Sequence, residues 1–280
     1  MKVKQVKNYM AILRNLRNIL DKNVSPKHLE MVCESIRDPV AVAKSKQFPY
    51  RFVSAYKELE HEAKASKVLA ALSDAVELSV QNIPEFSGKT FVTCDISGSM
   101  SSTPSARSKI SMKEIGCLFG AIMQKKAADS VVSVFATDHV PISLNSRDSM
   151  FTNVRKMLMT DVHGYGTEAY KVMEWLNKNK VFVDRIVVFS DMQCYTTTDG
   201  SHFSTHENLY SGLIKYRQTV NKNVFVYSFD LSEYGEVQFP KDDGRVCQIG
   251  GWSDKVLSFI PMFERSRIDM LAEIESVTVS

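Results

Sequence analysis

Residues 90–99 read Thr-Phe-Val-Thr-Cys-Asp-Ile-Ser-Gly-Ser, and this segment gives the clearest indication of the fold class. Its first five residues are β-branched, aromatic and nearly continuous in apolar character, as strands buried on both faces of a parallel sheet are. Similar runs follow at residues 131–135, 185–189 and 224–229. Helical stretches separate most of them, at residues 110–128, 146–158, 168–178 and 207–220. Alternating strands and helices predict an α/β domain with a doubly wound, mostly parallel, Rossmann-like sheet.

The same patterns indicate where this domain ends. The run Val-Pro-Ile at residues 140–142 predicts an antiparallel edge strand, where proline is tolerated. Residues 252–262 predict a closing helix, so we place the domain at residues 85–264. Residues 265–280 are expected to form a helical extension that lies back on the N-terminal part of the chain.

Residues 1–84 follow a helical period instead. Apolar side chains recur every three or four positions from Val3 to Leu20, which predicts a first helix along that stretch. Proline stands at or near the first helical position of three more helices, at Ser25-Pro26, Asp38-Pro39 and Phe48-Pro49. A longer helix ends before Pro84. Short helices in succession predict a small α-helical segment of the HEAT type.

Composition restricts the class of protein. The chain has 280 residues, of which 44% are hydrophobic and 24% charged, as in a soluble globular protein. It holds no apolar run of about 20 residues that could span a membrane, and its N-terminus does not resemble a signal peptide. The five cysteines are scattered and never form a Cys-x-x-Cys pair, which favours a reducing compartment. We therefore expect a cytoplasmic protein with no membrane partner.

Charge is distributed unevenly along the chain. Residues 1–57 contain twelve Lys and Arg residues against four Asp and Glu residues, whereas the net charge of the whole chain is only +3. A basic head on a mildly acidic body suggests a polyanion as partner, although such asymmetry is often only a solvated surface.

Oxygen-bearing side chains gather where the strands are expected to end. Asp95, Ser97 and Ser99 alternate directly after the first strand, Thr167 closes a glycine-rich loop, and Asp191 follows the third main strand. In open α/β sheets ligands bind at the carboxyl ends of the strands. Carboxylates and hydroxyls suit a hard cation such as Mg²⁺ or Mn²⁺, with a coordination position left for an acidic ligand. Taken alone, the first loop could equally be a polar turn that caps the next helix.

The order of these motifs resembles the metal-ion-dependent adhesion site of von Willebrand factor A domains. The order is Asp-x-Ser-x-Ser at residues 95–99, Gly-x-Gly-Thr at residues 164–167 and Ser-Asp at residues 190–191. The resemblance implies that Ser97, Ser99 and Thr167 contact the ion directly. Asp95 and Asp191 would then act largely through bound waters.

Further blocks are similar to the Ro autoantigen (TROVE) family. They lie at residues 10–17, 29–34, 48–56 and 134–138, with Val140-Pro141 after them, and keep the family's order. The resemblance implies a cytoplasmic RNA-binding protein whose helical repeats form a ring, take in single-stranded RNA ends and bind small non-coding RNAs, without catalysing a reaction. A full member has several more repeats before the block at residues 10–17. The resemblance therefore leaves open a truncated or mobile-element version of the family, or one half of a split protein whose second chain supplies the repeats. Gly98 and Tyr165 also stand where other small residues are expected.

Six basic residues are candidates for contacting RNA phosphates: Lys4, Lys7, Arg14, Arg17, Lys44 and Arg51. The alternative for each is a solvated helix surface. Tyr50, Phe52 and Tyr56 could stack on bases, but their spacing is more typical of a helix core.

Other functions remain as alternatives. A protein-interaction module would use the metal site on a partner's carboxylate and would not bind RNA. His202 and His206, near Cys194 and Asp199, could hold zinc only with a clearer fourth ligand. Catalysis fits poorly, because the serine motif is not a Gly-x-Ser-x-Gly elbow and a phosphatase would want an aspartate at the position of Ser97. Cys94 and Cys117 are expected to be buried packing residues.

Overall fold

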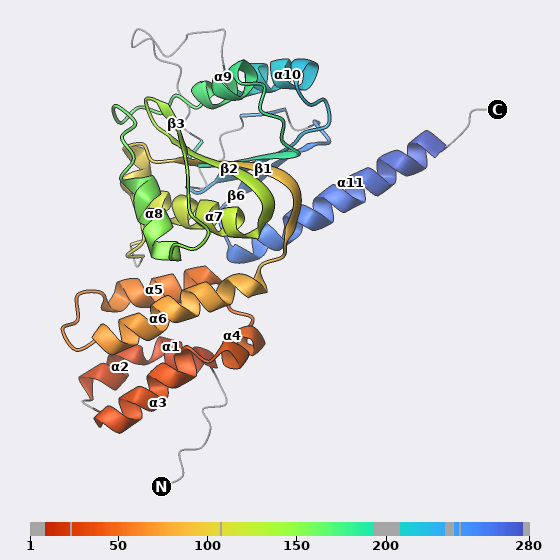
Figure 1. Cartoon of the computed structure of the whole chain (residues 1–280). Helices are drawn as coiled ribbons and strands as arrows, with labels where there is room; N and C mark the ends of the chain where they lie inside the picture. Colours follow the sequence, from red (N-terminus) through yellow and green to blue (C-terminus); the bar gives the residue numbers. More distant parts are fainter. Residues whose placement is uncertain are drawn as a thin grey trace.

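The computed structural model describes residues 9–22, 24–106, 108–192, 208–232, 238–240 and 242–276. An α-helical segment lies below an α/β domain, in which helices cover both faces of one sheet (Figure 1). The predicted fold class is confirmed. None of the described helices is both long enough and apolar enough to cross a bilayer.

Short helices make up the N-terminal segment. They are α1 (Tyr9–Arg14), α2 (Leu16–Asp21), α3 (Pro26–Ile36), α4 (Pro39–Ser45), α5 (Pro49–Leu59), α6 (Ser66–Ser79) and the 3₁₀ helix η1 (Val80–Asn82). The three proline starts are confirmed. Ser25 caps α3 by accepting the His28 N–H, and Asp38 caps α4 by accepting the Ala41 N–H at 2.7 Å.

The expected first helix is interrupted in its described part. It breaks at Asn15, between α1 and α2, where the Asn15 N–H donates to the Ile12 carbonyl and the side-chain amide donates to the Ala11 carbonyl. Asparagine competes in this way for backbone partners, which apolar periodicity does not register.

Among the described residues, the sheet holds six strands in the order β3-β2-β1-β4-β5-β6. They are β1 (Phe86–Asp95), β2 (Ala127–Phe135), β3 (His139–Ile142), β4 (Arg185–Ser190), β5 (Phe225–Asp230) and β6 (Val246–Gly250). Only β3 pairs antiparallel, on the outer side of β2, as its proline predicted. β6 was not predicted, because its sequence Val-Cys-Gln-Ile-Gly mixes polar and apolar residues and the strand is only half-buried at the sheet edge.

Helices cover both faces of the sheet in the described part of the chain. α7 (Met112–Lys126) and α8 (Met150–Leu158) lie on the side of the helical segment, and α9 (Tyr170–Lys178) and α10 (Leu209–Thr219) lie on the opposite side (Figure 1). α7 begins with a capping box in which Ser111 and Glu114 bond each other's backbone N–H groups.

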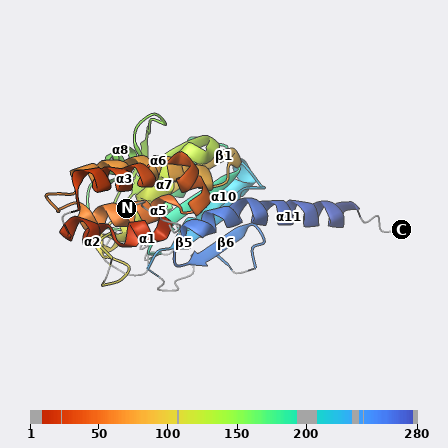
Figure 2. The ribbon, with the colours of Figure 1, turned by 90° about the horizontal axis from the view of Figure 1, so that it is seen from below.

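The C-terminal part differs from the prediction. After the short η3 (Asp254–Ser258), the expected closing helix and extension form one continuous helix, α11 (Phe259–Ser276). It runs away from α1–α6 and does not lie back on them (Figures 1 and 2). Its first half is anchored to the sheet, because Phe263 packs against Phe225 and Tyr227 and Glu264 bonds Arg185. Residues 262–276 contain no glycine or proline, so nothing in the sequence breaks the helix along this stretch.

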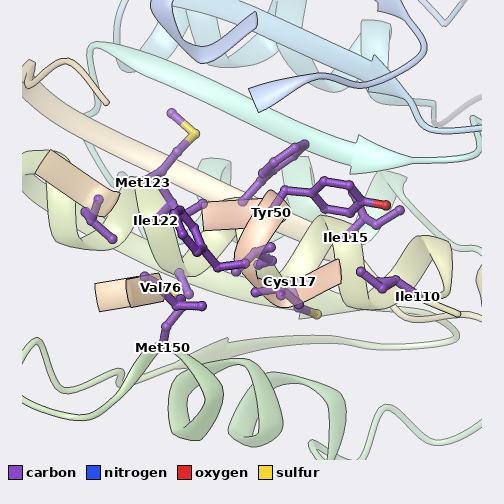
Figure 3. Close-up of a cluster of buried hydrophobic side chains, with 14 of the residues drawn as sticks. Tyr50, Val76, Ile110, Ile115, Cys117, Ile122, Met123 and Met150 are labelled. Carbon is purple, nitrogen blue, oxygen red and sulfur yellow. The ribbon is translucent and has the colours of Figure 1, made fainter. Parts of the chain in front are cut away.

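One hydrophobic core joins the helical segment to the α/β domain. Tyr50 packs against Trp252 with ring centroids 4.3 Å apart, and Tyr56 against Phe151 at 4.6 Å. Lys57 pairs with Glu114 across the same boundary at 2.9 Å. Figure 3 shows part of this cluster, to which α5, α6, α7 and α8 contribute. The division at residue 84 stays a prediction, since the described core is continuous across it.

Two expectations about single residues agree with this packing. Phe52 is fully buried and Tyr50 nearly so, which leaves neither ring free for stacking on a base. Cys94 and Cys117 are both fully buried free thiols.

Candidate metal centre

The predicted metal site lies where the order of the strands reverses. The chain passes from β1 to β2 and β3 on one side of the sheet and then continues with β4 on the other side of β1. Asp95 is the last residue of β1, and Asp191 follows the last residue of β4. Because β1 and β4 are parallel neighbours, both aspartates stand at the same edge of the sheet.

The first loop folds around the Asp95 carboxylate. Its Oδ1 accepts the Ser97 N–H at 2.8 Å, and its Oδ2 accepts the Ser190 hydroxyl at 2.6 Å. The Oγ atoms of Ser97 and Ser99 are 3.3 Å apart. Asp95 and Ser97 are fully buried, whereas Ser99 is exposed. The loop therefore runs from the buried carboxylate of Asp95 to the hydroxyl of the exposed Ser99.

The glycine-rich loop that carries Thr167 packs against the first loop. The Gly98 N–H donates to the Tyr165 carbonyl at 3.2 Å, and the Gly166 N–H donates to Thr137 Oγ1 at 3.0 Å. A Cβ at Gly164 would lie 2.6 Å from that hydroxyl, and its φ of +142° suits glycine. Thr167 is 8% exposed.

The third loop brings the second carboxylate. Asp191 is fully buried and lies close enough to Asp95 for its charge to raise the pKa of Asp95. The Ser190 hydroxyl, which donates to Asp95, also accepts the Met192 N–H at 3.1 Å. Contacts between the loops thus place Ser97, Ser99 and Thr167 in adjoining segments, and Asp95 and Asp191 stand at the ends of adjoining strands.

Electrostatics at Asp95 favour a bound cation. Burial, with a smaller contribution from the charge of Asp191, raises the pKa of Asp95 to about 7, although the hydrogen bonds from Ser190 and Ser97 lower it. None of these groups is a cation. A buried carboxylate without a positive partner is unfavourable, and a divalent ion would relieve it.

The donor set also suits a hard metal. It consists of two carboxylates and three hydroxyls, the ligand types of Mg²⁺ and Mn²⁺. Among the residues that the structure describes, no group of three or more His, Cys, Asp or Glu side chains is placed to bind a metal, so the softer sites typical of zinc are not found there. His202, His206, Cys194 and Asp199 lie outside the described residues. The residues present fit a magnesium-type ion.

Two residues that support the site were not predicted from the sequence. Ser190 orients Asp95, and Thr137 holds the glycine-rich loop. Ser190 was visible as the serine before Asp191, but its role depends on the pairing of β1 with β4. Thr137 follows β2 and shows no signal without knowledge of the fold.

The six basic residues that were candidates for contacting RNA do not all lie together. Arg14, Arg17 and Arg51 line one cavity of about 430 Å³ between α1, α2 and α5. Arg17 donates to the Glu58 carbonyl at 2.8 Å and lies 3.5 Å from its carboxylate. Lys44 is exposed on α4 and does not line this cavity. Lys4 and Lys7 lie outside the described residues.

Known proteins match this chain in both sequence and fold. Residues 89–264 match the family model described as the Ro60 vWA domain. The telomerase protein component 1 of Mus musculus is 38% identical over 52 residues, and that of Rattus norvegicus is 40% identical over 52 residues. Each of these matches covers 19% of this chain and 2% of the relative.

Among solved structures, the crystal structure of the Deinococcus radiodurans Ro (RSR) protein superposes with a TM-score of 0.76 at 17% sequence identity. The match covers 94% of this chain and 54% of the other, so the chain spans about half the length of that protein. At this identity the superposition shows the fold alone. The family model, however, matches well over half of the chain. The chain therefore belongs to the Ro60 vWA domain family, as its resemblance to the Ro autoantigens predicted.

Proposed function

We propose that this chain is an RNA-binding module of the Ro type. Its helical segment would bind the phosphate backbone of a small non-coding or misfolded RNA. Its α/β domain would hold Mg²⁺ or Mn²⁺ and dock an acidic group. The observation that carries the RNA proposal is the convergence of Arg14, Arg17 and Arg51 in one cavity.

The chemistry of that cavity suits a nucleic-acid backbone. Arg14 and Arg51 are exposed and form no ion pair with any residue that the structure describes. Leu13, Leu16 and Leu59 are among the apolar residues of the lining. Guanidinium groups bind phosphate oxygens in a planar, two-pronged geometry, and two such groups without acidic partners are available for them.

Metal binding is supported by the adjoining loops. Ser97, Ser99 and Thr167 would hold the ion, and Asp95 and Asp191 would orient its waters. Bound there, the ion supplies a positive charge with a free coordination position for an anionic oxygen. Ser190 and the Ser97 N–H keep the Asp95 carboxylate turned toward this edge of the sheet.

Salt dependence tests the RNA proposal. We expect fluorescence-polarisation titrations with a single-stranded-ended RNA to lose affinity steeply between 50 and 200 mM salt. The double variant Arg14→Ala, Arg51→Ala should weaken binding at all sequences and reduce the salt slope by about one for each phosphate contact removed. Arg155→Ala, an exposed arginine on α8, is the matched control. Absent binding, or affinity that salt does not change, would refute the proposal.

A second function rests on the metal site alone. In a protein-interaction module, the ion would recognise a carboxylate on a partner and the arginine cavity would play no part. The favouring observation is that the five predicted ligands belong to the α/β domain and none to the helical segment. Pull-downs with and without EDTA distinguish it, and partners retained equally after chelation would count against it.

A further inference from the structure

Tyr165 is the most exposed large hydrophobic side chain in the described part of the chain. It is 86% exposed, more than Met159 at 71% or Met262 at 68%. Its ring and hydroxyl form no hydrogen bond, ion pair or ring pair with the residues that the structure describes. An aromatic ring exposed to water does not gain the stabilisation that burial would give it. Its exposure therefore favours a role in binding.

The backbone that carries this ring is fixed from both sides. The Tyr165 carbonyl accepts the Gly98 N–H at 3.2 Å, and the next residue, Gly166, donates to Thr137 Oγ1. Further along, the Glu168 N–H donates to the Ala136 carbonyl at 2.8 Å. The loop therefore holds Tyr165 at a set position, with its ring turned to solvent.

That position adjoins the predicted metal ligands. A Cβ built at Gly98 would lie 3.3 Å from the Cβ of Tyr165 and 3.8 Å from its Cδ1. Gly98 stands between Ser97 and Ser99, so the ring begins beside the residue that joins these two predicted ligands. A group that takes the free coordination position of the ion would have this ring as its neighbour.

We propose that Tyr165 stacks on a nucleobase of the RNA whose phosphate or ribose oxygen docks at the metal site. This inference rests on the proposed function. A nucleotide carries an anionic oxygen and a flat ring in one unit, which matches a metal site beside an exposed aromatic face. A carboxylate side chain of a protein carries only the first of these. Stacking on tyrosine tolerates any base, because every base has a π-face.

The test compares two ribonucleotide decamers in the presence of Mg²⁺. One is oligoadenylate, and the other has the same sugar-phosphate backbone without bases. We expect Tyr165→Ala to weaken oligoadenylate binding about 5- to 100-fold and to leave the abasic decamer within twofold. Tyr165→Phe should retain the affinity, because stacking uses the ring face. The control is Phe182→Ala, an aromatic residue 54% exposed ahead of β4, at the opposite edge of the sheet.

Each outcome separates this inference from the proposed function. If Tyr165→Ala binds oligoadenylate as the wild type does, while Arg14→Ala, Arg51→Ala binds it weakly, stacking is wrong and RNA binding stands. Equal losses for both decamers would also overturn stacking. If the wild type binds neither decamer but takes an acidic peptide in the presence of Mg²⁺, both ideas fail and the partner is a protein.

Discussion

Glu264→Ala should cause a large loss of stability, because it would strand a buried arginine. Arg185 begins β4, and its side chain is only 3% exposed. Its Nε and Nη2 donate to the two carboxylate oxygens of Glu264 at 2.7 and 2.8 Å, and its Nη1 donates to Thr90 Oγ1 at 2.7 Å. The Tyr227 hydroxyl lies 3.2 Å from Glu264 Oε1. These contacts tie α11 to three neighbouring strands.

The size of the effect follows from what remains after the change. Without Glu264 the guanidinium keeps one hydroxyl partner and no counter-charge among these groups. Removing one member of a buried pair costs about 3–5 kcal/mol. Replacing both members, as in Arg185→Met with Glu264→Leu, removes the unpaired charge. The double variant should therefore lose less free energy of unfolding than the single variant.

Urea unfolding followed by tryptophan fluorescence measures this effect. Trp252 lies close to α11 in sequence, and Trp175 lies on α9, so the two should report one transition if the core unfolds as a unit. Glu30→Ala is the control, because its pair with Arg37 is over 40% exposed on both sides and should contribute less than about 1 kcal/mol. A loss below about 1 kcal/mol for Glu264→Ala, or a double variant as unstable as the single one, would show that the pair with Arg185 does not stabilise the fold as described.

Three further predictions follow from the site and the core. Asp95→Asn should weaken Mn²⁺ binding, measured by calorimetry, about 10- to 100-fold with little change in the melting temperature without metal, and unchanged affinity would contradict the site. His139→Phe should remove an acid-dependent loss of stability. Burial lowers the pKa of His139 to about 4 against 6.5 for an unperturbed imidazole, so the unfolded state binds more protons between these values and stability falls as the pH drops through that window. The loss is at most about 3 kcal/mol, and parallel pH curves for the variant and the wild type would disprove it. Gly120→Val should destabilise by about 1–3 kcal/mol in urea titrations, because even a Cβ would lie 2.8 Å from Cys94 Sγ and 3.0 Å from Met157 Cε, and a neutral result would contradict that packing.

Much of the fold could be predicted because local chemistry decides it. The buried strands are continuous apolar runs, and Ser25 and Asp38 cap helices that begin at proline. β6 could not be found in this way, because its pairing with β5 decides it and its own residues are only half-buried. The course of α11 depends on a contact between Arg185 and Glu264, which are 79 residues apart. The apolar periodicity of one helix does not indicate which distant residue it contacts.

In the candidate site, too, some residues could be predicted from the sequence and others depend on contacts between distant segments. Asp95 and Asp191 could be placed because carboxyl ends of parallel strands meet at one edge. Ser190 could not be assigned, since its hydroxyl reaches Asp95 only across two paired strands, 95 residues apart in sequence. Likewise, Tyr165 was noticeable only as a departure from the family pattern. Its importance depends on its exposure and on its contact with Gly98.

Two departures from ordinary burial meet at this one edge of the sheet. Asp95 is a carboxylate that is fully buried beside a second carboxylate, and Tyr165 is an aromatic residue left 86% exposed on an adjoining, hydrogen-bonded loop. Each arrangement lowers stability, and natural proteins tend to keep such conflicts at functional sites. A cation would relieve the first and a flat apolar ligand face would relieve the second. We infer that the two persist together because a single ligand, a nucleotide docked on a bound metal ion, satisfies both.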